Sequence, residues 1–310
     1  MGYYTEFNRK ANTTIVVNTG NAGSVFFYDK EFWSSDACFS LYPNKDIIDK
    51  YLYLYIYGCE RILKGKIRAG AMPTIDAKAV EDLIIPIPSL SEQTRIVGIL
   101  DTFTDAIENL KKQIAKRRKQ YEHYRDQLLD LEGKEGVEVK TLPEISNNCD
   151  RERKPITSSK RVSGIYPYYG ASGIVDYVDS YIFDGDYLLI SEDGANLLAR
   201  TTPIAFSIKG KNWVNNHAHV LHFNDCVTQK FVEIYLNMIN LEPWINGAAQ
   251  PKLNQDNLNR IEIPLPSLSE QSRIVSILDT FEASISNLEA QLKQREKQYE
   301  YYRNKLLTFK

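Results

Sequence analysis

Two stretches of this chain carry hydrophobic residues at alternating spacings of three and four positions. This spacing is typical of the a and d positions of a heptad repeat, and it continues for more than four heptads in each stretch. Two helices with such seams bury them most economically against each other. The sequence therefore predicts two long helices, over 86–132 and 264–310, that pair as a coiled coil. The seam positions are Leu100, Phe103, Ile107, Leu110, Ile114, Arg117, Tyr121, Tyr124, Leu128 and Leu131 in the first stretch, and Leu278, Phe281, Ile285, Leu288, Leu292, Arg295, Tyr299, Tyr302, Leu306 and Phe309 in the second.

The two predicted helices are copies of one another. Aligning 85–129 with 263–307 needs no gap, and 29 of the 45 positions are identical. Both copies begin with PSLSEQ, in which Ser89 with Glu92 and Ser267 with Glu270 fit a capping box. Duplication implies a pseudo-two-fold axis, and a two-fold axis perpendicular to the helices makes the pair antiparallel. Forty helical residues span roughly 60 Å.

Arg117 and Arg295 interrupt the two seams at the same place. A polar residue at a seam position can fix the register of a coiled coil. Alternatively, each arginine packs its aliphatic stem on the seam and extends its charged head into solvent. The sequence leaves both interpretations open.

The stretches before the two helices predict globular domains. Residues 137–262 combine segments rich in β-branched and aromatic residues with Gly and Asp turns, followed by a stretch with helical spacing. Residues 1–84 match the second part of this domain: NTGNAGS (Asn18–Ser24) takes the place of SEDGAN (Ser191–Asn196), and Gly70-Ala-Met-Pro takes the place of Gly247-Ala-Ala-Gln-Pro. Both globules then run into a strand and the IPxPSL phrase. The first globule lacks a counterpart of about 35 residues, roughly 137–172.

The predicted fold class is therefore α+β. Two α/β globules alternate with two long helices, which pair as an antiparallel coiled coil with pseudo-two-fold symmetry. The expected boundaries are 1–85 for the first globule, 86–132 for the first helical region, 133–263 for the second globule and 264–310 for the second helical region.

Composition narrows the class of protein. A net charge of −2 argues against a general nucleic-acid coat, which would be strongly basic, although it allows a specific reader with local basic patches. No apolar run approaches the roughly 20 residues of a membrane span, and the N-terminus lacks the apolar core of a signal peptide. Four scattered cysteines indicate thiols of a reducing compartment. We therefore expect a cytoplasmic protein without a membrane partner.

The duplicated PSLSEQ-RIV-ILD helices, the run Asp184–Gly194 and NNHAHVL (Asn215–Leu221) resemble the specificity subunit of type I restriction–modification systems. The resemblance covers the whole chain. It implies two target-recognition domains, each of which reads one half of a split target in double-stranded DNA. It also implies that the helices set the half-site spacing.

The same resemblance implies partners. Two methyltransferase (modification) subunits, which bind S-adenosylmethionine, would dock on the chain, and restriction/translocase subunits would join for cleavage. The chain itself would hold no cofactor and perform no chemistry. The first recognition domain would be shortened at its N-terminus relative to the family. The competing interpretation is a coiled-coil scaffold whose globules bind protein.

The second globule offers most of the candidate DNA contacts. RERKPITSSKR, from Arg151 to Arg161, is a basic segment with turn residues, and it is either a phosphate-contacting or a solvated loop. Tyr168 and Tyr169 either face DNA or belong to the core. The loop around SEDGAN allows close backbone approach, or is a plain hairpin turn. The candidates are Arg151, Arg153, Lys154, Lys160, Arg161, Tyr168, Tyr169, Ser191, Asn196, Arg200, Asn215, Asn216, His217, Gln250 and Lys252.

The first globule offers fewer candidates, in the equivalent loops. They are Asn18, Thr19, Asn21, Ser24, Lys66 and Arg68. His217, His219 and His222 lie close in sequence, but no Cys or acidic cluster completes a ligand set, so we predict no metal site. No methyltransferase motif, phosphate-binding GxxxxGK[ST] or HExxH is present. We therefore predict a non-catalytic protein.

Overall fold

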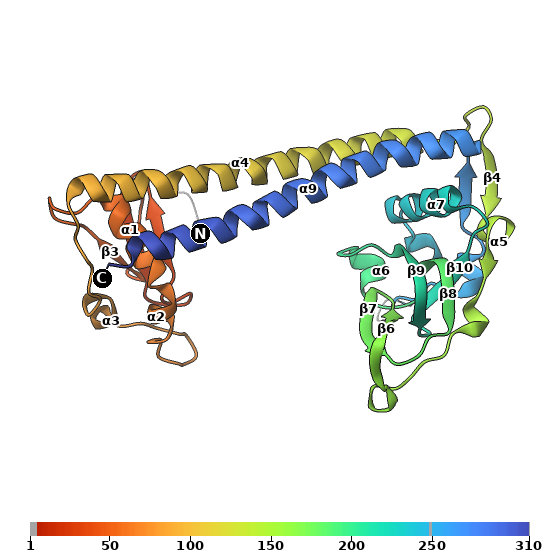
Figure 1. The fold of residues 1–310 in the computed structure, drawn as a ribbon, viewed down its shortest axis with the longest axis horizontal. Helices are drawn as coiled ribbons and strands as arrows, with labels where there is room; N and C mark the ends of the chain where they lie inside the picture. The colour runs from red at the N-terminus through yellow and green to blue at the C-terminus, as the bar shows by residue number, and fades with distance from the viewer. Residues whose placement is uncertain (1–4, 248–249, 310) are drawn as a thin grey trace. The chain divides into compact units, whose positions relative to one another are not determined.

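The computed structural model describes residues 5–247 and 250–309 and divides the chain into two units. The first consists of Met1–Ala115 with Ser286–Lys310, and the second of Lys116–Ile285. Both units draw on the two long helices, α4 (Leu90–Leu129) and α9 (Leu268–Leu307), which Figure 1 labels. Each helix begins and ends a few residues inside its predicted region. The α+β class is confirmed.

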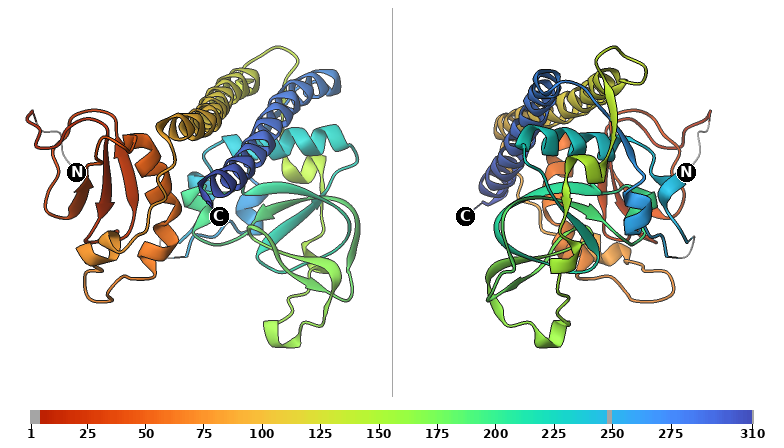
Figure 2. Two further views of the ribbon diagram at one scale, coloured as in Figure 1. Left: turned by 60° about the vertical axis from the view of Figure 1, so that its left-hand side comes forward. Right: turned by 90° about the vertical axis from the view of Figure 1, so that its right-hand side faces the viewer.

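The first unit contains a small sheet and its covering helices. The strands lie in the order β2-β1-β3, and both pairings are antiparallel. Helix α1 packs against the sheet through Leu52 and Ile56, which share a buried cluster with Val16 and Val25 (Figure 2). The elements are β1 (Thr13–Val17), β2 (Val25–Tyr28), β3 (Cys38–Leu41), α1 (Asp49–Gly58), α2 (Glu60–Lys64) and α3 (Ala77–Glu81).

The second unit contains a six-stranded sheet in the order β5-β10-β8-β9-β6-β7. Its pairings are antiparallel except for β6 with β9. Strands β4 and β11 form a separate two-stranded sheet. The strands are β4 (Glu138–Thr141), β5 (Asn147–Asn148), β6 (Ser163–Gly170), β7 (Gly173–Val178), β8 (Phe183–Ser191), β9 (Ala205–Val214), β10 (Ala218–His222) and β11 (Glu262–Leu265).

Helix α7 covers the sheet of the second unit. Its residues Phe231 and Leu236 are fully buried in one cluster with Leu188 of β8 and with Ile274 and Leu278 of α9. One core therefore joins the sheet to the start of α9. The helices are α5 (Leu142–Ile145), η1 (Asp150–Glu152), η2 (Ser158–Lys160), α6 (Asn196–Ala199), α7 (Cys226–Met238), η3 (Glu242–Trp244) and α8 (Gln255–Leu258).

The long helices run antiparallel in each unit. In the first unit, Phe103 stacks on Tyr302 with ring centroids 5.3 Å apart, and Lys111 pairs with Glu296 at 3.5 Å. In the second unit, Tyr124 stacks on Phe281, also at 5.3 Å. Residue numbers that rise along α4 meet falling numbers along α9, which confirms the predicted orientation.

Most seam positions are only partly buried. Leu100 and Leu278 are fully buried and Ile114 nearly so, whereas Tyr124 is 43% exposed and Tyr302 39% exposed. The reason is geometric: a helix with one helical partner leaves one flank of its seam open to solvent. The intermediate positions are Phe103, Ile107, Leu110, Arg117, Tyr121, Leu128, Phe281, Ile285, Leu288, Leu292, Tyr299 and Leu306.

The two arginines reach across to the opposite helix. The guanidinium of Arg117 lies 5.6 Å from the ring centroid of Phe281, and that of Arg295 lies 5.8 Å from Phe103. Each cation therefore faces an aromatic ring, a favourable arrangement. Each guanidinium thus lies against an aromatic ring of the opposite helix, an arrangement that differs from both interpretations of the sequence.

The predicted capping boxes form only in part. The hydroxyls of Ser89 and Ser267 accept from the N–H groups of Glu92 and Glu270, at 3.3 and 3.4 Å. The two glutamates do not reach back to the cap, because each pairs with the arginine three residues on. A complete box occurs instead at Thr141 and Glu144, which start α5.

The predicted strand before the first helix does not form. Residues 83–89 have no regular structure, whereas the corresponding β11 pairs with β4 in the second unit. The physical reason is that a strand needs a partner, and residues 137–148 have no counterpart in the first globule. No helix among the described residues is long and apolar enough to cross a membrane.

Candidate nucleic-acid interface

The two globules build the same loop arrangement. In the second, Gly194 N–H donates to the carbonyl of Pro251 at 3.0 Å; in the first, Gly20 N–H donates to Pro73 at 2.9 Å. The next rungs also correspond: Leu253 donates to Glu192, and Ile75 donates to Asn18, each at 2.8 Å. This confirms the equivalence of the two glycine loops that the sequence predicted. Of the GAAQP stretch, Ala248 and Ala249 lie outside the described residues.

Both loops turn at a glycine in the left-handed region. Gly20 has φ = 84° and Gly194 has φ = 107°, a conformation that other residues rarely adopt. A side chain added at either glycine would meet no atom within 4 Å. The space above each backbone is therefore open, so that a ligand can approach the main chain closely. This feature is common to the two globules and is independent of their different side chains.

A buried network of charges lies beneath the loops of the second globule. His219 Nδ1 lies 2.6 Å from Asp150 Oδ2, and its Nε2 lies 2.7 Å from the Leu253 carbonyl. Both ring nitrogens therefore face oxygen atoms. Arg153 pairs with Glu192 at 2.7 Å and with Asp150 at 3.3 Å.

The network extends to the surface through Lys252, whose Nζ lies 3.1 Å from Glu192. Three cations thus surround two carboxylates. Burial by itself raises the pKa of Asp150, but the hydrogen bond and charge of His219, the Val220 N–H and the charge of Arg153 outweigh it and leave the pKa below its ordinary value. The balance is the same for Glu192, where Arg153, His219 and Lys252 outweigh burial and lower the pKa.

Asp150, Glu192 and His219 also bring possible metal-ligand atoms within 4.8 Å of one another. These atoms are already engaged: both nitrogens of His219 have partners, and Arg153 and Lys252 neutralise the carboxylates. A divalent cation would add charge to a set that three cations already balance. The donor set fits an ion-pair network that ties residues 150–153 to the loops.

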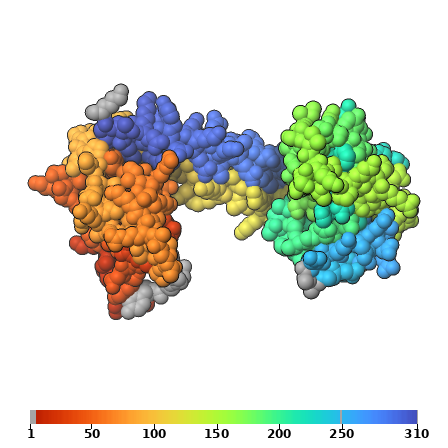
Figure 3. All heavy atoms as spheres, turned by 90° about the horizontal axis from the view of Figure 1, so that it is seen from below, coloured from red at the N-terminus to blue at the C-terminus, as the bar shows by residue number. Residues whose placement is uncertain are grey.

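Seven of the predicted contacts of the second globule are exposed. His217 pairs with Asp193 at 2.9 Å and keeps 51% of its side chain exposed, and Lys252 keeps 52%. Figure 3 shows the yellow-green segment from about residue 150 to 180 on the visible surface of this unit. We call the exposed set the candidate contact surface; it comprises Arg151, Lys154, Lys160, Asn216, His217, Gln250 and Lys252.

Other predicted contacts lie inside the globule. Arg153 keeps only 13% of its side chain exposed, within the network described above. Arg161 keeps 17%, pairs with Asp176 and lies 4.4 Å from the ring centroid of Tyr168. Tyr168 is itself buried, and its hydroxyl accepts from the Ile156 N–H at 2.9 Å. In this structure these three side chains hold the loop in place and expose little surface.

Ser191 and Asn215 are also buried. Ser191 donates to the carbonyl of Ala171, and Asn215 accepts from the His217 N–H. Asn196 closes its own loop by accepting from Thr202 N–H at 3.0 Å. Tyr169 is half-buried, and burial raises the pKa of its hydroxyl. Packing and loop closure account for these residues.

Arg200 occupies a different place from the one predicted. Its guanidinium donates to the carbonyls of Leu236, Asn237 and Ile239, the last at 2.7 Å. A cation at the carboxyl end of a helix satisfies carbonyls that lack a partner within the helix. Arg200 therefore caps α7. Burial lowers the pKa of this arginine.

The candidates of the first globule divide in the same way. Asn21 and Lys66 are exposed, and Arg68 forms an ion pair with Asp76 while keeping 70% of its side chain exposed. Asn18 donates to the carbonyl of Asp36 at 2.8 Å, and Thr19 donates to Asn18. Ser24 is buried.

Asp150 and His219 were not among the predicted contacts, although they organise the site. Their signal lies in the comparison of the two globules. In the strand pairings, β3 places Phe39 where β10 places His219. In the loops, the carbonyl of Asn18 accepts the hydrogen bond that corresponds to the one accepted by Glu192. The first globule thus has Phe39 and Asn18 in place of the ionic partners His219 and Glu192. It also has no counterpart of the segment that contains Asp150 and Arg153.

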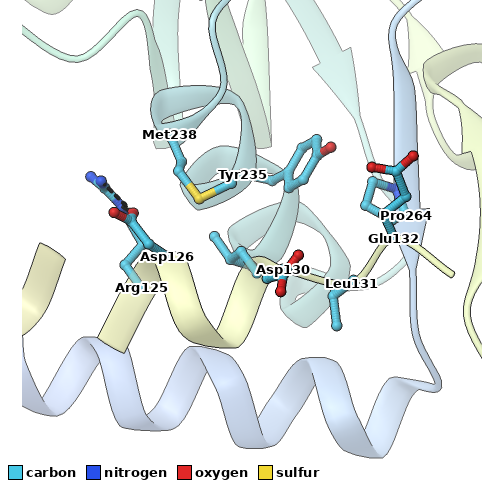
Figure 4. Close-up of a pocket in the computed structure, with 9 residues that line it drawn as sticks. Arg125, Asp126, Asp130, Leu131, Glu132, Tyr235, Met238 and Pro264 are labelled. Carbon is cyan, nitrogen blue, oxygen red and sulfur yellow. Dashed lines mark hydrogen bonds and ion pairs between the residues drawn. The ribbon is translucent and has the colours of Figure 1, made fainter. Parts of the chain in front are cut away.

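A hollow of about 440 Å³ lies beside the carboxyl end of α4 in the second unit. Figure 4 shows Tyr235 and Met238 of α7 on one side and Asp126 and Asp130 on the other. With Glu132, three carboxylates line this hollow against one cation, Arg125, which pairs with Asp126. Such a lining repels phosphate, so the hollow does not belong to the candidate contact surface.

Comparisons with known proteins agree with this architecture. The family model described as "Type I restriction modification DNA specificity domain" matches residues 1–117 and 134–297. Because the match covers most of the chain, this protein belongs to that family.

Curated relatives carry names from the same systems. A putative type I restriction enzyme specificity subunit of Haemophilus influenzae is 44% identical over 186 residues, which are 57% of this chain and 48% of that protein. The EcoprrI specificity subunit of Escherichia coli is 29% identical over 258 residues, 77% of this chain and 62% of that protein. The aligned part thus spans about half to three fifths of these two relatives.

The fold also matches a solved structure. The S subunit of a type I restriction–modification system from M. genitalium superposes with a TM-score of 0.70 at 20% identity, covering 100% of this chain and 86% of that one. A structure titled for complex assembly of the type I R-M system matches with a TM-score of 0.59 at 16% identity, over 96% and 81%. At these identities the likeness shows a shared fold.

Proposed function

We propose that this chain reads DNA sequence for a type I restriction–modification complex. Each globule would recognise one half of a bipartite double-stranded target. The observation that carries the proposal is the duplicated loop arrangement, in which Gly20 with Pro73 and Gly194 with Pro251 form the same open turn. Family membership supplies the kind of ligand.

The candidate contact surface has the composition that DNA reading requires. Arg151, Lys154 and Lys160 are exposed cations, which suit phosphate contacts that position the protein without reading sequence. Asn216 and Gln250 are exposed amides, which can pair with the donor and acceptor of an adenine edge. The exposed set therefore includes side chains suited to both kinds of contact.

The ion-pair network has a defined part in this proposal. Glu192 and Asp150 would repel phosphates if they were free, but Arg153, His219 and Lys252 neutralise them. The network also fixes residues 150–153 against the loops, so that Arg151 is presented from an ordered segment. Ordered side chains lose less conformational entropy when they bind.

The helix pair would act as a spacer and as a docking surface. Two copies of one helix allow two equal docking sites, which fits two methyltransferase subunits. Those subunits would bind S-adenosylmethionine, and restriction/translocase subunits would complete the assembly. In this proposal the chain holds no cofactor and contributes specificity, and it acts in the cytoplasm where the DNA lies.

The proposal is tested by selection from random DNA. The purified chain, in complex with its methyltransferase subunit, is incubated with a randomised duplex library, and the retained DNA is sequenced. We expect two short conserved blocks separated by a fixed number of unconserved positions. Retained DNA without any conserved block would show a sequence-blind binder and would contradict the proposal.

A further inference from the structure

The first globule has an open groove where the second globule is filled. A groove of about 420 Å³ lies beside β3 and α3, lined by Arg9, Leu41, Tyr42, Ala77 and Val80 among others. In the second globule, β4 pairs with β11, and Leu142 of α5 shares one buried cluster with Leu221 of β10 and Leu258 of α8. The second globule therefore shows which kind of segment can pack at the equivalent positions.

The correspondence is set by equivalent residues. The sheet registers align Leu41 with Leu221, and the repeat, offset by 178 positions, aligns Val80 with Leu258 and Ile85 with Ile263. In the second globule Leu221, Leu258 and Ile263 are at most 2% exposed, in one cluster with Leu142 of α5. Their counterparts in the first globule are more open to solvent: Leu41 and Ile85 are partly exposed, and Val80 is 9% exposed.

The segment before α4 also lacks a strand partner among the described residues. In the second globule, β11 pairs with β4 through Ile263 with Lys140 and Leu265 with Glu138. The counterparts of Ile263 and Leu265 are Ile85 and Ile87, whose backbone groups form no hydrogen bond with another described residue. Ile87 is 53% exposed. Residues 84–87 therefore present an unpaired edge.

Two side-chain hydrogen bonds from α1 hold this segment in place. The hydroxyls of Tyr51 and Tyr55 of α1 donate to the carbonyls of Pro86 and Ile84, at 2.8 and 3.1 Å. In the described part of the chain, the backbone groups of Ile85 and Ile87 form no hydrogen bond with α1. A strand added here would lose little entropy from ordering the edge.

We propose that this groove and edge are a docking site for an extended segment of a partner polypeptide. The segment would have the chemistry of residues 137–146, VEVKTLPEIS: a strand that pairs with residues 84–87, followed by one helical turn whose leucine enters the groove. This is strand addition, in which main-chain hydrogen bonds give affinity and a side-chain pocket gives selectivity. The inference does not depend on DNA recognition.

The test uses the full chain and a labelled synthetic peptide of residues 136–148, GVEVKTLPEISNN. Fluorescence anisotropy measures binding. We expect saturable one-to-one binding that falls at least about tenfold for the peptide with Leu142→Asp, because the burial of a leucine is removed. A peptide with Val139→Ser is the matched control, since Val139 is 61% exposed in its own globule, and it should bind within about twofold.

Chain variants locate the site. Ile87→Pro removes the N–H of residue 87 and should weaken binding at least about tenfold, whereas Ile84→Ala, at a side chain 89% exposed, should not. Absence of saturable binding would overturn the proposal. So would binding that the Leu142→Asp peptide shares, or binding indifferent to Ile87→Pro, which would indicate exchange with β4 of the second globule. DNA selection by the complex is a separate readout, so either proposal can fail alone.

Discussion

Phe103 of α4 stacks on Tyr302 of α9 with an interplanar angle of 26°, and the repeat-equivalent pair, Phe281 and Tyr124, stacks at 29°. Subtracting the repeat offset of 178 from Phe281 and Tyr302 gives Phe103 and Tyr124. One contact therefore occurs twice, once in each unit. Arg295 and Arg117 face the two phenylalanine rings in the same way.

The symmetry predicts equal effects of equivalent substitutions. Phe103→Ala and Phe281→Ala should each lower the free energy of unfolding by about 1–2 kcal/mol, because each removes a half-buried ring and its stacking contact with a tyrosine. Urea unfolding, monitored by hydrogen exchange, would measure the loss of stability in each variant. Asp105→Ala, at an exposed position of α4, should change stability little. A large effect of only one phenylalanine would contradict a shared role.

The network around Asp150 predicts an acid-sensitive fold. The pKa of Asp150 is lower in the folded state than its ordinary value, so its stabilisation is fully present above about pH 4 and is lost as the pH falls through the folded pKa. Asp150→Asn should cost about 3 kcal/mol at neutral pH, because His219 and Arg153 lose a buried counter-charge.

The pH dependence separates this from a general packing defect. The free energy of unfolding of the Asp150→Asn variant should change less between pH 5 and pH 2 than that of the parent chain. Asp186→Asn is the control, since its carboxylate is 48% exposed and lies 3.7 Å from Lys209. If the free energy of unfolding of Asp150→Asn falls with acid as steeply as that of the parent chain, the Asp150 carboxyl does not contribute as inferred.

Arg200 should matter for stability and not for DNA binding. Arg200→Ala removes the cap of α7 and should lower the free energy of unfolding by about 1–2 kcal/mol. DNA affinity, measured well below the melting temperature at fixed salt, should stay unchanged. A loss of affinity in a fully folded variant would restore the sequence-based prediction that Arg200 contacts DNA.

The exposed cations should control the salt dependence of DNA binding. Replacing Arg151, Lys154 and Lys160 with Ala should reduce the slope of log K against log salt by up to about one for each phosphate that is no longer neutralised. The matched control replaces Lys112, Lys119 and Lys293, which are also exposed and lie on the long helices. If both triple variants behave alike, the effect is one of net charge, and the candidate contact surface is misplaced.

Much of this architecture could be predicted from the sequence, for reasons that particular residues make clear. The helices, their antiparallel order and the equivalence of the loops follow from periodicity and duplication, which are local patterns. The contact residues did not follow, because exposure depends on tertiary packing. Arg151 and Arg153 stand two positions apart, yet one is exposed and the other lies between Asp150 and Glu192.

The missing strand before α4 shows the same limit. IPIP and IPLP are nearly identical phrases, but only the second forms a strand, because only it has β4 beside it. Local sequence encoded the capacity to pair, while a distant segment decided the outcome. The ion-pair network likewise depends on Asp150 and His219, which are 69 residues apart.

The central claim is that this chain selects DNA sequence through its two globules, and the methylome tests it most directly. The chain is expressed with its methyltransferase subunit in a host without other DNA methylation, and modified bases are mapped across the genome. We predict one bipartite motif methylated on both strands, with one half that changes when residues 133–263 are exchanged for those of a relative. Methylation without a split motif, or a motif unaffected by that exchange, would contradict the claim.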